Sequence, residues 1–204
     1  RIDCFEGAKD LPAIVHCAAK LRVALKDKLL LFTFRTKAEG GKVALSHEEY
    51  LHFIRTVLAT DCADLIDIEF FTAGAELPAL IEEAHTAGAA VVCSSHDFHK
   101  TPPRAELVSR MVAMQQAGAD LPKLAVMPQS RADVLELLAA TAEMADRHPE
   151  TPIITMSMGA LGAVSRLAGE AFGSAMTFAN PGQASAPGQV SLEVVNKVLD
   201  ALHL

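Results

Sequence analysis

The sequence predicts an α/β fold built from parallel strands, and three observations support this class. Short apolar runs alternate along the chain with amphipathic segments, a pattern typical of parallel strands joined by helices. Some runs hold polar residues in their interior, namely Asp67, Glu69 and Lys123. No GxGxxG motif follows any run, so a dinucleotide-binding open sheet lacks its signature. A (β/α)8 barrel, whose lumen can hold polar side chains near a site, is therefore favoured over a doubly wound open sheet.

Six runs are expected to be full strands because they are short, apolar and bounded by turn residues. They are Leu29–Phe34, Asp64–Phe71, Ala89–Ser95, Leu121–Met127, Pro152–Met158 and Ala175–Phe178. A barrel of this class has eight strands. The chain begins with Arg1-Ile2-Asp3 and not with Met, and this tripeptide is interpreted as the end of another strand. We therefore expect one barrel domain over residues 1–204 that lacks its first βα unit.

Helix start signals separate these strands. Ser46 with Glu49 and Ser130 with Asp133 have the spacing of capping boxes, in which side chains satisfy the first free amides of a helix. The expected helices are Leu11–Leu25 after Asp10, 47–59 after Ser46, a helix from Thr101-Pro102 to near Gly118, one from Ser130 to about Arg147, and Leu192–Leu202 after Ser191.

Composition excludes several classes of partner. Half of the 204 residues are hydrophobic, which is enough for a sizeable core, and no uncharged apolar stretch approaches the length of a membrane span. The net charge is −7 and no dense basic patch is present, so nucleic acid is not expected. The four cysteines show no CxxC or other metal spacing, and we interpret them as reduced thiols of a cytoplasmic protein. A small-molecule substrate is the expected partner.

Lys123 is the most informative residue of the chain. It lies within the apolar run Leu121–Pro128, where an unpaired ammonium would be costly to bury. Desolvation lowers the pKa of a lysine and makes its amine a nucleophile towards ketones and aldehydes. Another strand leads into His96-Asp97-Phe98-His99, so a buried amine and a strand-end histidine together suggest imine chemistry with proton transfer. The alternative is that Lys123 extends out of a strand end and is structural.

Other polar residues follow strand ends, where barrels of this class build their sites. His96 and His99 are not expected to bind a metal, because HxxH at a strand end does not direct both rings at one ion and no third ligand other than Asp97 stands at a supporting spacing. The turns Met158–Gly162 and Asn180–Gly182 fit either phosphate binding or plain turn chemistry. The small polar segment Ala184–Gln189 is either a lid or a connector.

Several motifs, in order along the chain, resemble type I 3-dehydroquinate dehydratase. They are Leu31–Arg35, Glu39–Gly41, His96–Pro102, Pro122–Pro128, Ile154–Gly159, Ser165–Glu170 and Ser185–Gln189. The resemblance implies a (β/α)8 barrel, usually a homodimer, that acts in the shikimate pathway with a Schiff-base lysine and with neither metal nor cofactor. Only Arg1 remains here of a Glu-x-Arg segment that contacts substrate in the family.

By the same resemblance, Lys123 forms the imine, His96 is the general acid and base, and Glu39 orients or tunes His96. The substrate-binding residues carried over are Arg1, Arg35, Arg166, Ser185 and Gln189, with Arg166 as the partner of the substrate carboxylate. The reaction implied is syn elimination of water from 3-dehydroquinate to 3-dehydroshikimate. The alternatives are another class I Schiff-base enzyme of the aldolase type, which would need a phosphate site, and an inactive truncated fragment of the dehydratase.

Overall fold

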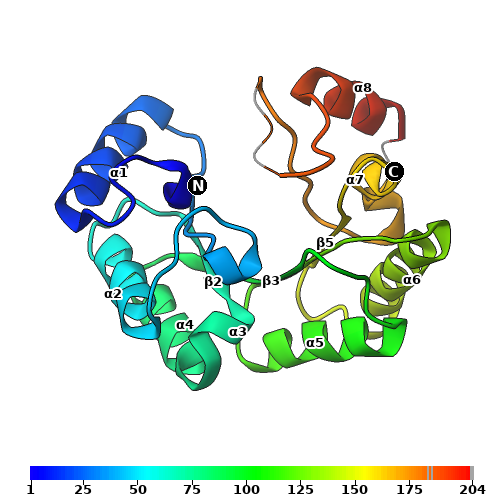
Figure 1. Ribbon diagram of the computed structural model, residues 1–204, viewed down its shortest axis with the longest axis horizontal. Helices are drawn as coiled ribbons and strands as arrows, with labels where there is room; N and C mark the ends of the chain where they lie inside the picture. Colours follow the sequence, from blue (N-terminus) through cyan, green and yellow to red (C-terminus); the bar gives the residue numbers. More distant parts are fainter. Residues whose placement is uncertain (183, 185, 203–204) are drawn as a thin grey trace. The chain divides into compact units, whose positions relative to one another are not determined.

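The computed structural model describes residues 1–182, 184 and 186–202, in which parallel strands alternate with helices (Figure 1). The five strands in this part of the chain are β1 (Leu31–Thr33), β2 (Leu65–Glu69), β3 (Ala90–Asp97), β4 (Leu121–Val126) and β5 (Ile154–Ser157). The helices are α1 (Leu11–Leu25), α2 (His47–Leu58), α3 (Phe70–Ala73), α4 (Leu77–Thr86), α5 (Arg104–Gln116), α6 (Arg131–Arg147), α7 (Ala163–Leu167) and α8 (Leu192–Leu202). None of the helices described is long and apolar enough to cross a membrane.

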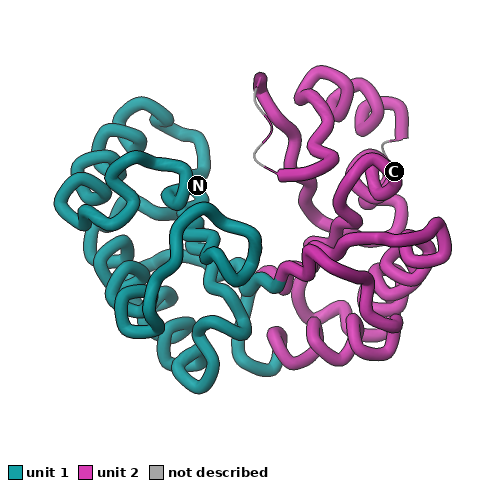
Figure 2. Tube along the Cα trace, viewed as in Figure 1, with its two compact units in different colours: residues 1–95, 116–120 teal, residues 96–115, 121–204 magenta. Residues whose placement is uncertain are grey.

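The chain divides into two compact units (Figure 2). Unit 1 comprises residues 1–95 and 116–120, and unit 2 comprises residues 96–115 and those from 121 onward. In unit 1, β2 pairs in parallel with both β1 and β3, with Leu65 opposite Leu31 and Ala90. In unit 2, β4 pairs in parallel with β5, with Lys123 opposite Ile154. The polar strand residue Lys123 therefore belongs to unit 2, whereas Asp67 and Glu69 belong to unit 1.

Strand β2 shows why polar residues can occupy a buried strand. All five of its residues are buried, and successive side chains of a strand point to opposite faces. Ile66 and Ile68 therefore share one face and belong to the apolar core, whereas Asp67 and Glu69 share the other. The apolar core of unit 1 also includes Tyr50, Phe53 and Ile54 of α2. The polar face of β2 must find hydrogen-bond partners, because buried carboxylates are stable only when paired.

The helix start signals of the sequence are confirmed at both capping boxes. The Ser46 hydroxyl accepts a hydrogen bond from the Glu49 amide, the Glu49 carboxylate accepts one from the Ser46 amide, and Ser130 and Asp133 make the same exchange. Asp10 caps α1 through the Ala13 amide at 3.1 Å. Helix α5 begins at Arg104, later than expected, because Pro103 disfavours helical geometry at the preceding Pro102. Helix α4 was not anticipated.

Two strand predictions are wrong. Residues 175–178 form no strand in the structure, although Ser174 makes an isolated bridge to Ile153. The reason is that the Ser174 hydroxyl, and not a backbone carbonyl, accepts the Thr155 amide at 3.1 Å, so the ladder does not continue. The supposed strand end at Arg1 is a 3-10 turn over Ile2–Cys4. The described strands therefore number five, not six.

The loop after β1 folds back tightly on itself. The Gly41 amide donates to the Thr36 carbonyl at 2.8 Å, and the Lys37 amide donates to the Val43 carbonyl at 3.1 Å. A Cβ atom on Gly41 would overlap the carbonyl group of Arg35, and backbone atoms cannot move aside as a flexible side chain can. Glycine is therefore required at this position by close packing.

We expect Gly41→Ala to lower the free energy of unfolding by about 1–3 kcal/mol, since the added methyl group forces the backbone apart. Urea denaturation followed by circular dichroism measures this loss. Gly182→Ala is the matched control, because no atom of the described residues lies within 4 Å of a Cβ atom placed there. Equal stability of the two variants would show that the Thr36–Val43 loop adapts to the methyl group.

Candidate active site

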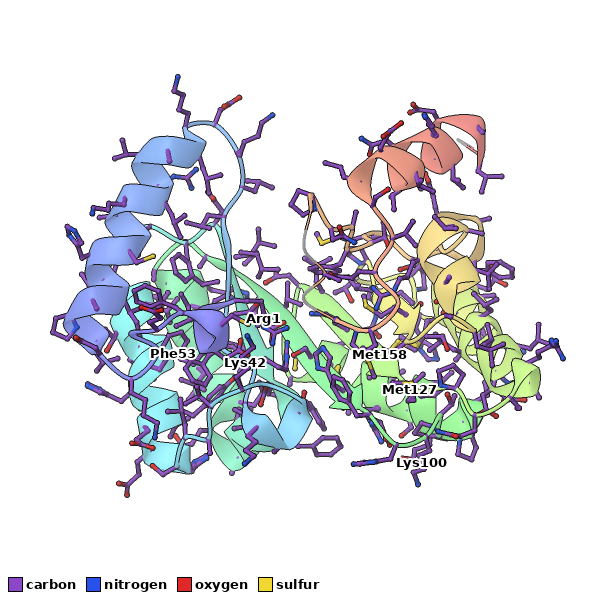
Figure 3. All side chains as sticks on the ribbon, turned by 45° about the horizontal axis from the view of Figure 1, so that its top comes forward. Arg1, Lys42, Phe53, Lys100, Met127 and Met158 are labelled. Carbon is purple, nitrogen blue, oxygen red and sulfur yellow. The ribbon has the colours of Figure 1, made fainter. Side chains whose placement is uncertain are left out.

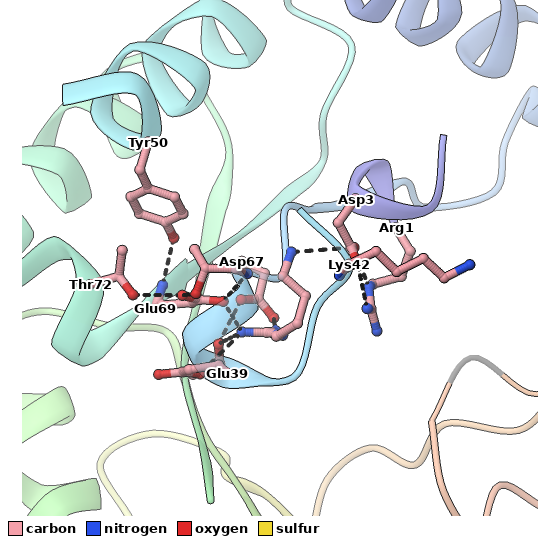
Figure 4. A network of polar contacts seen from close by, with 11 residues as sticks. Arg1, Asp3, Glu39, Lys42, Tyr50, Asp67, Glu69 and Thr72 are labelled. Atoms are coloured by element: carbon pink, nitrogen blue, oxygen red, sulfur yellow. Dashed lines mark hydrogen bonds and ion pairs between the residues drawn. The ribbon is translucent and has the colours of Figure 1, made fainter. Parts of the chain in front are cut away.

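Unit 1 holds a buried ionic cluster that includes Glu39, Asp67 and Glu69 (Figure 4), and the ion pairs of all three with Arg35 place Arg35 at its centre. Arg35 is 2% exposed, and its Nη1 atom donates to Glu69 at 2.8 Å and to Glu39 at 3.3 Å. Nη2 donates to Asp67 at 2.8 Å, and the Ser94 hydroxyl accepts from Nη1 at 2.9 Å. Burial by itself would lower the pKa of Arg35, but the charges of Asp67, Glu69 and Glu39 outweigh it and raise that pKa. The charge of Arg35 is thus already shared among three carboxylates.

Glu39 is held at the edge of this cluster. It closes the 3-10 turn Lys37–Glu39, is 5% exposed, and reaches Arg35 by the longest of the three ion pairs. The neighbouring thiol of Cys93 has its pKa raised, first by burial and then by the charges of Asp67 and Glu39. Cys93 is accordingly a buried thiol and not a nucleophile.

Arg1 lies elsewhere in unit 1 and is engaged by its neighbour Asp3. Its Nε and Nη2 atoms donate to the two carboxylate oxygens of Asp3 at 2.6 and 2.7 Å, as Figure 4 shows. Asp3 also accepts from the backbone amides of Arg35 at 3.4 Å and Lys42 at 3.2 Å. Asp3 therefore ties Arg1 to the loop that carries Glu39.

Lys123 is buried on β4 of unit 2, with 6% of its surface exposed. Its Nζ atom lies 4.6 Å from the centre of the Phe178 ring, close enough for a cation–π contact. The side chain is thus buried, whereas the alternative reading had it extend into solvent. Phe178 was not singled out from the sequence, although it is the aromatic residue of the run Ala175–Phe178.

His96 and His99 have different environments within unit 2. His96 lies near the C-terminal end of β3, is partly buried, and stacks on the Phe98 ring with 6.5 Å between ring centres. Asp97 accepts the amides of His99 and Lys100 at 2.8 and 2.9 Å, which turns the chain out of the strand. His99 is exposed. Of the two histidines, His96 is therefore the less exposed to solvent.

Arg166 is a buried cation of a different kind from Arg35. It lies in α7, is 2% exposed, and donates to the Met156 thioether at 3.3 Å and the Pro187 carbonyl at 3.1 Å. Among the residues described, none forms a hydrogen bond with its Nε atom and no carboxylate forms an ion pair with it. Burial lowers the pKa of Arg166. A buried guanidinium with neutral neighbours and an unused donor is suited to receive an anion.

The segment around Pro187 contacts the end of β5. The Pro187 carbonyl accepts both Arg166 and the Gly159 amide, the latter at 3.3 Å, and the Gln189 carbonyl accepts Asn180 Nδ2 at 3.2 Å. Ser185 lies outside the described residues. Met127 and Met158 lie near one another beyond β4 and β5 (Figure 3), where the Met158 amide donates to Val126 at 2.8 Å. Among the residues described, no group of histidine, cysteine or acidic side chains is arranged to hold a metal.

Comparison with known proteins gives a consistent result over the whole chain. The family model described as Type I 3-dehydroquinase matches residues 1–204. The chain is 49% identical over 202 residues to a 3-dehydroquinate dehydratase of Klebsiella pneumoniae, covering 99% of this chain and 80% of that protein. It is 48% identical over 203 residues to the 3-dehydroquinate dehydratase of Salmonella typhimurium, covering 100% of this chain and 81% of that protein.

Solved structures similar to this chain belong to the same class of enzyme as these relatives. A type I 3-dehydroquinate dehydratase of Clostridium difficile, crystallised with covalently modified comenic acid, has a TM-score of 0.95 at 45% identity and covers all of this chain and 80% of its own. The 3-dehydroquinate dehydratase of Enterococcus faecalis has a TM-score of 0.92 at 40% identity, with coverage of 100% and 81%. These likenesses confirm the α/β class of the barrel type expected from the sequence.

The two buried arginines are expected to respond oppositely to removal of their charge. Arg35→Met should lower the free energy of unfolding by about 3–5 kcal/mol, because it leaves three buried carboxylates without their cation. Arg166→Met should leave the free energy of unfolding unchanged or raise it by about 1 kcal/mol, because it removes a buried charge that has no described counter-ion. Urea denaturation of both variants at pH 7 measures the difference. Equal losses in the two variants would contradict this account.

Proposed function

Because the chain belongs to the type I 3-dehydroquinase family, we propose that it is a hydro-lyase that converts 3-dehydroquinate to 3-dehydroshikimate through a lysine Schiff base, in the shikimate pathway. The observation that carries this proposal is a family match over the whole chain in which the motif lysine, Lys123, is buried on a strand. The catalytic assignment of individual residues rests on their motifs and surroundings, which are taken in turn below.

Lys123 supplies the covalent step. Its neutral amine adds to the ketone carbon of 3-dehydroquinate, and loss of water gives an imine. The protonated imine draws electrons from the adjacent carbon and makes the proton on that carbon acidic. The Phe178 ring over Nζ supports the step that follows the attack, since an aromatic face stabilises the positive charge of the protonated imine.

His96 transfers the proton in both directions. As general base it takes the acidic proton from the carbon next to the imine, and as general acid it gives a proton to the hydroxyl that leaves the following carbon. One ring serving both steps accounts for a syn elimination. Water then hydrolyses the imine, which releases the product and restores Lys123. The shielding of His96 and the exposure of His99 support the choice between them.

Glu39 and the arginines position His96 and the substrate in this scheme. The family motif assigns to Glu39 the role of orienting the catalytic histidine, a role that carboxylates commonly have. Arg166 receives the substrate carboxylate, which its unused Nε donor and lack of a described carboxylate partner support. Arg35 donates hydrogen bonds to substrate oxygens by its family motif, and it is not the partner of the substrate carboxylate because three protein carboxylates already balance its charge. Arg1, Ser185 and Gln189 complete substrate binding, the last two from the covering loop.

Three further properties are proposed from the family alone. We propose that the working enzyme is a homodimer and that it acts in the cytoplasm. We also expect it to need neither metal nor cofactor, since the Schiff base itself acts as the electron sink. Size-exclusion chromatography with light scattering tests the first of these properties, and full activity after exhaustive treatment with a chelator tests the last.

Borohydride trapping separates the roles of Lys123 and His96. With 3-dehydroquinate and borohydride, the parent protein and His96→Ala should gain the mass of a reduced adduct, whereas Lys123→Ala should gain none. Turnover of His96→Ala should fall by about 10²–10⁴-fold, because a general acid and base is lost. Lys100→Ala is the control, since Lys100 is an exposed lysine of the same unit. An adduct on Lys123→Ala equal to that of the parent would refute the assignment, and trapping of an aldol substrate in preference to dehydroquinate would favour an aldolase.

Arg166→Met is expected to raise KM for 3-dehydroquinate by about 10–100-fold, the loss typical of a hydrogen bond to a charged group. The effect on kcat should be smaller, since the carboxylate binds before and throughout the reaction. Arg147→Met, at an exposed guanidinium of α6, is the control. Steady-state kinetics in which Arg166→Met keeps the KM of the parent would remove Arg166 from the binding site.

A further inference from the structure

Glu69 is the most heavily hydrogen-bonded carboxylate of the Arg35 cluster. Its side chain is fully buried, and each of its oxygens accepts two donors (Figure 4). Oε1 accepts Arg35 Nη1 and the Thr36 amide, both at 2.8 Å, and Oε2 accepts the hydroxyls of Thr36 at 2.7 Å and Thr72 at 2.6 Å. A carboxylate with both oxygens occupied by fixed donors is poorly placed to exchange a proton with substrate, so its role must be exerted through its partners.

Tyr50 holds the backbone of this same residue. It is the single tyrosine of the chain, is fully buried in α2, and its hydroxyl accepts the Glu69 amide at 2.8 Å. Burial, and then the charge of Glu69, raise the pKa of Tyr50 well above its ordinary value, so the phenol stays neutral. Tyr50 and Thr72 thus fix Glu69 from the helical side, one at its backbone and one at its carboxylate.

The loop that carries Glu39 is anchored on Glu69. Thr36 opens this loop, and both its amide and its hydroxyl donate to Glu69. The Thr36 carbonyl in turn accepts the amides of Glu39 at 3.1 Å and Gly41 at 2.8 Å. Arg35 Nη1 links Glu69 to the Glu39 carboxylate directly. The positions of Arg35 and Glu39 therefore both depend on Glu69.

We propose that Glu69 and Tyr50 are positioning residues that hold Arg35 and Glu39 in place for the dehydratase reaction. This inference rests on the proposed function for its catalytic meaning. A role in stability alone fits the composition of the cluster poorly, because replacing buried ionic groups by apolar side chains of similar size is often neutral or stabilising. A network that gathers three carboxylates on one guanidinium instead gives each member a fixed direction.

The test uses Glu69→Gln and Tyr50→Phe, which keep the shape of each side chain. Because both displace Arg35, each should raise KM for 3-dehydroquinate about tenfold, as small misplacements of a binding group do. Thr141→Val is the matched control, since it removes a buried hydroxyl that bonds Thr155 at 2.7 Å in unit 2. Mere loss of folded protein would lower apparent kcat and leave KM unchanged, and that result in both variants would overturn the proposal. If Glu69→Gln fails to fold, the kinetics of Tyr50→Phe alone test the proposal.

A double-mutant cycle with Glu39→Gln then asks whether Glu69 acts through Glu39. If it does, Glu69→Gln should lower kcat in the parent background and have little further effect on kcat in the Glu39→Gln background. Additive losses of kcat would show that Glu69 acts independently of Glu39 and would count against the proposal.

Hydrogen exchange provides a readout that does not depend on turnover. In Glu69→Gln and Tyr50→Phe, the amides of Lys37, Glu39 and Gly41 should exchange at least about tenfold faster, whereas those of α6 should exchange as in the parent. Unchanged exchange in the loop would overturn the positioning role even if the enzyme is active. Absence of turnover in the parent protein, measured first, would count against the proposed function and leave the exchange result to decide the inference.

Discussion

The ion pairs of Arg35 with Asp67, Glu69 and Glu39 are the interaction on which the architecture of unit 1 depends. Strand β2 can bury two acids on one face only because a guanidinium from the end of β1 meets them there. The same guanidinium fixes where the chain turns after β1. The packing of the strands and the position of the loop that carries Glu39 therefore depend on the same ion pairs. A change in one is expected to alter the other.

Strands and capping boxes were predictable because they depend on local sequence. Leu65–Glu69 and Ile154–Ser157 lie within the predicted apolar runs, and Ser46 and Ser130 cap the helices expected of them. The prediction of a strand over Ala175–Phe178 was wrong because a strand needs hydrogen bonds to a neighbouring strand as well as an apolar sequence. There the Ser174 hydroxyl accepts the hydrogen bond of the Thr155 amide, which a backbone carbonyl would accept in a regular ladder. The spacing of residues in the sequence does not indicate that a side chain replaces the backbone as acceptor.

The candidate site was predictable in its residues and not in their partners. Lys123 and His96 stand out by motif and by their place in or beside apolar strands. That Phe178 covers the amine of Lys123, that Arg35 is balanced by three acids, and that Arg166 lies among neutral groups all depend on contacts over long sequence separations. Two arginines that look alike in sequence thus differ in what each can offer a substrate.

The solitary tyrosine gives the molecule an optical property. The chain has no tryptophan, so nearly all of its ultraviolet absorbance near 280 nm and its intrinsic emission come from the phenol of Tyr50, which touches the end of β2. Light therefore reports on one unit of the protein. The absorbance and fluorescence of Tyr50 report on changes around Glu69. Changes confined to the unit that holds Lys123 do not alter this signal unless a second chromophore is introduced in that unit.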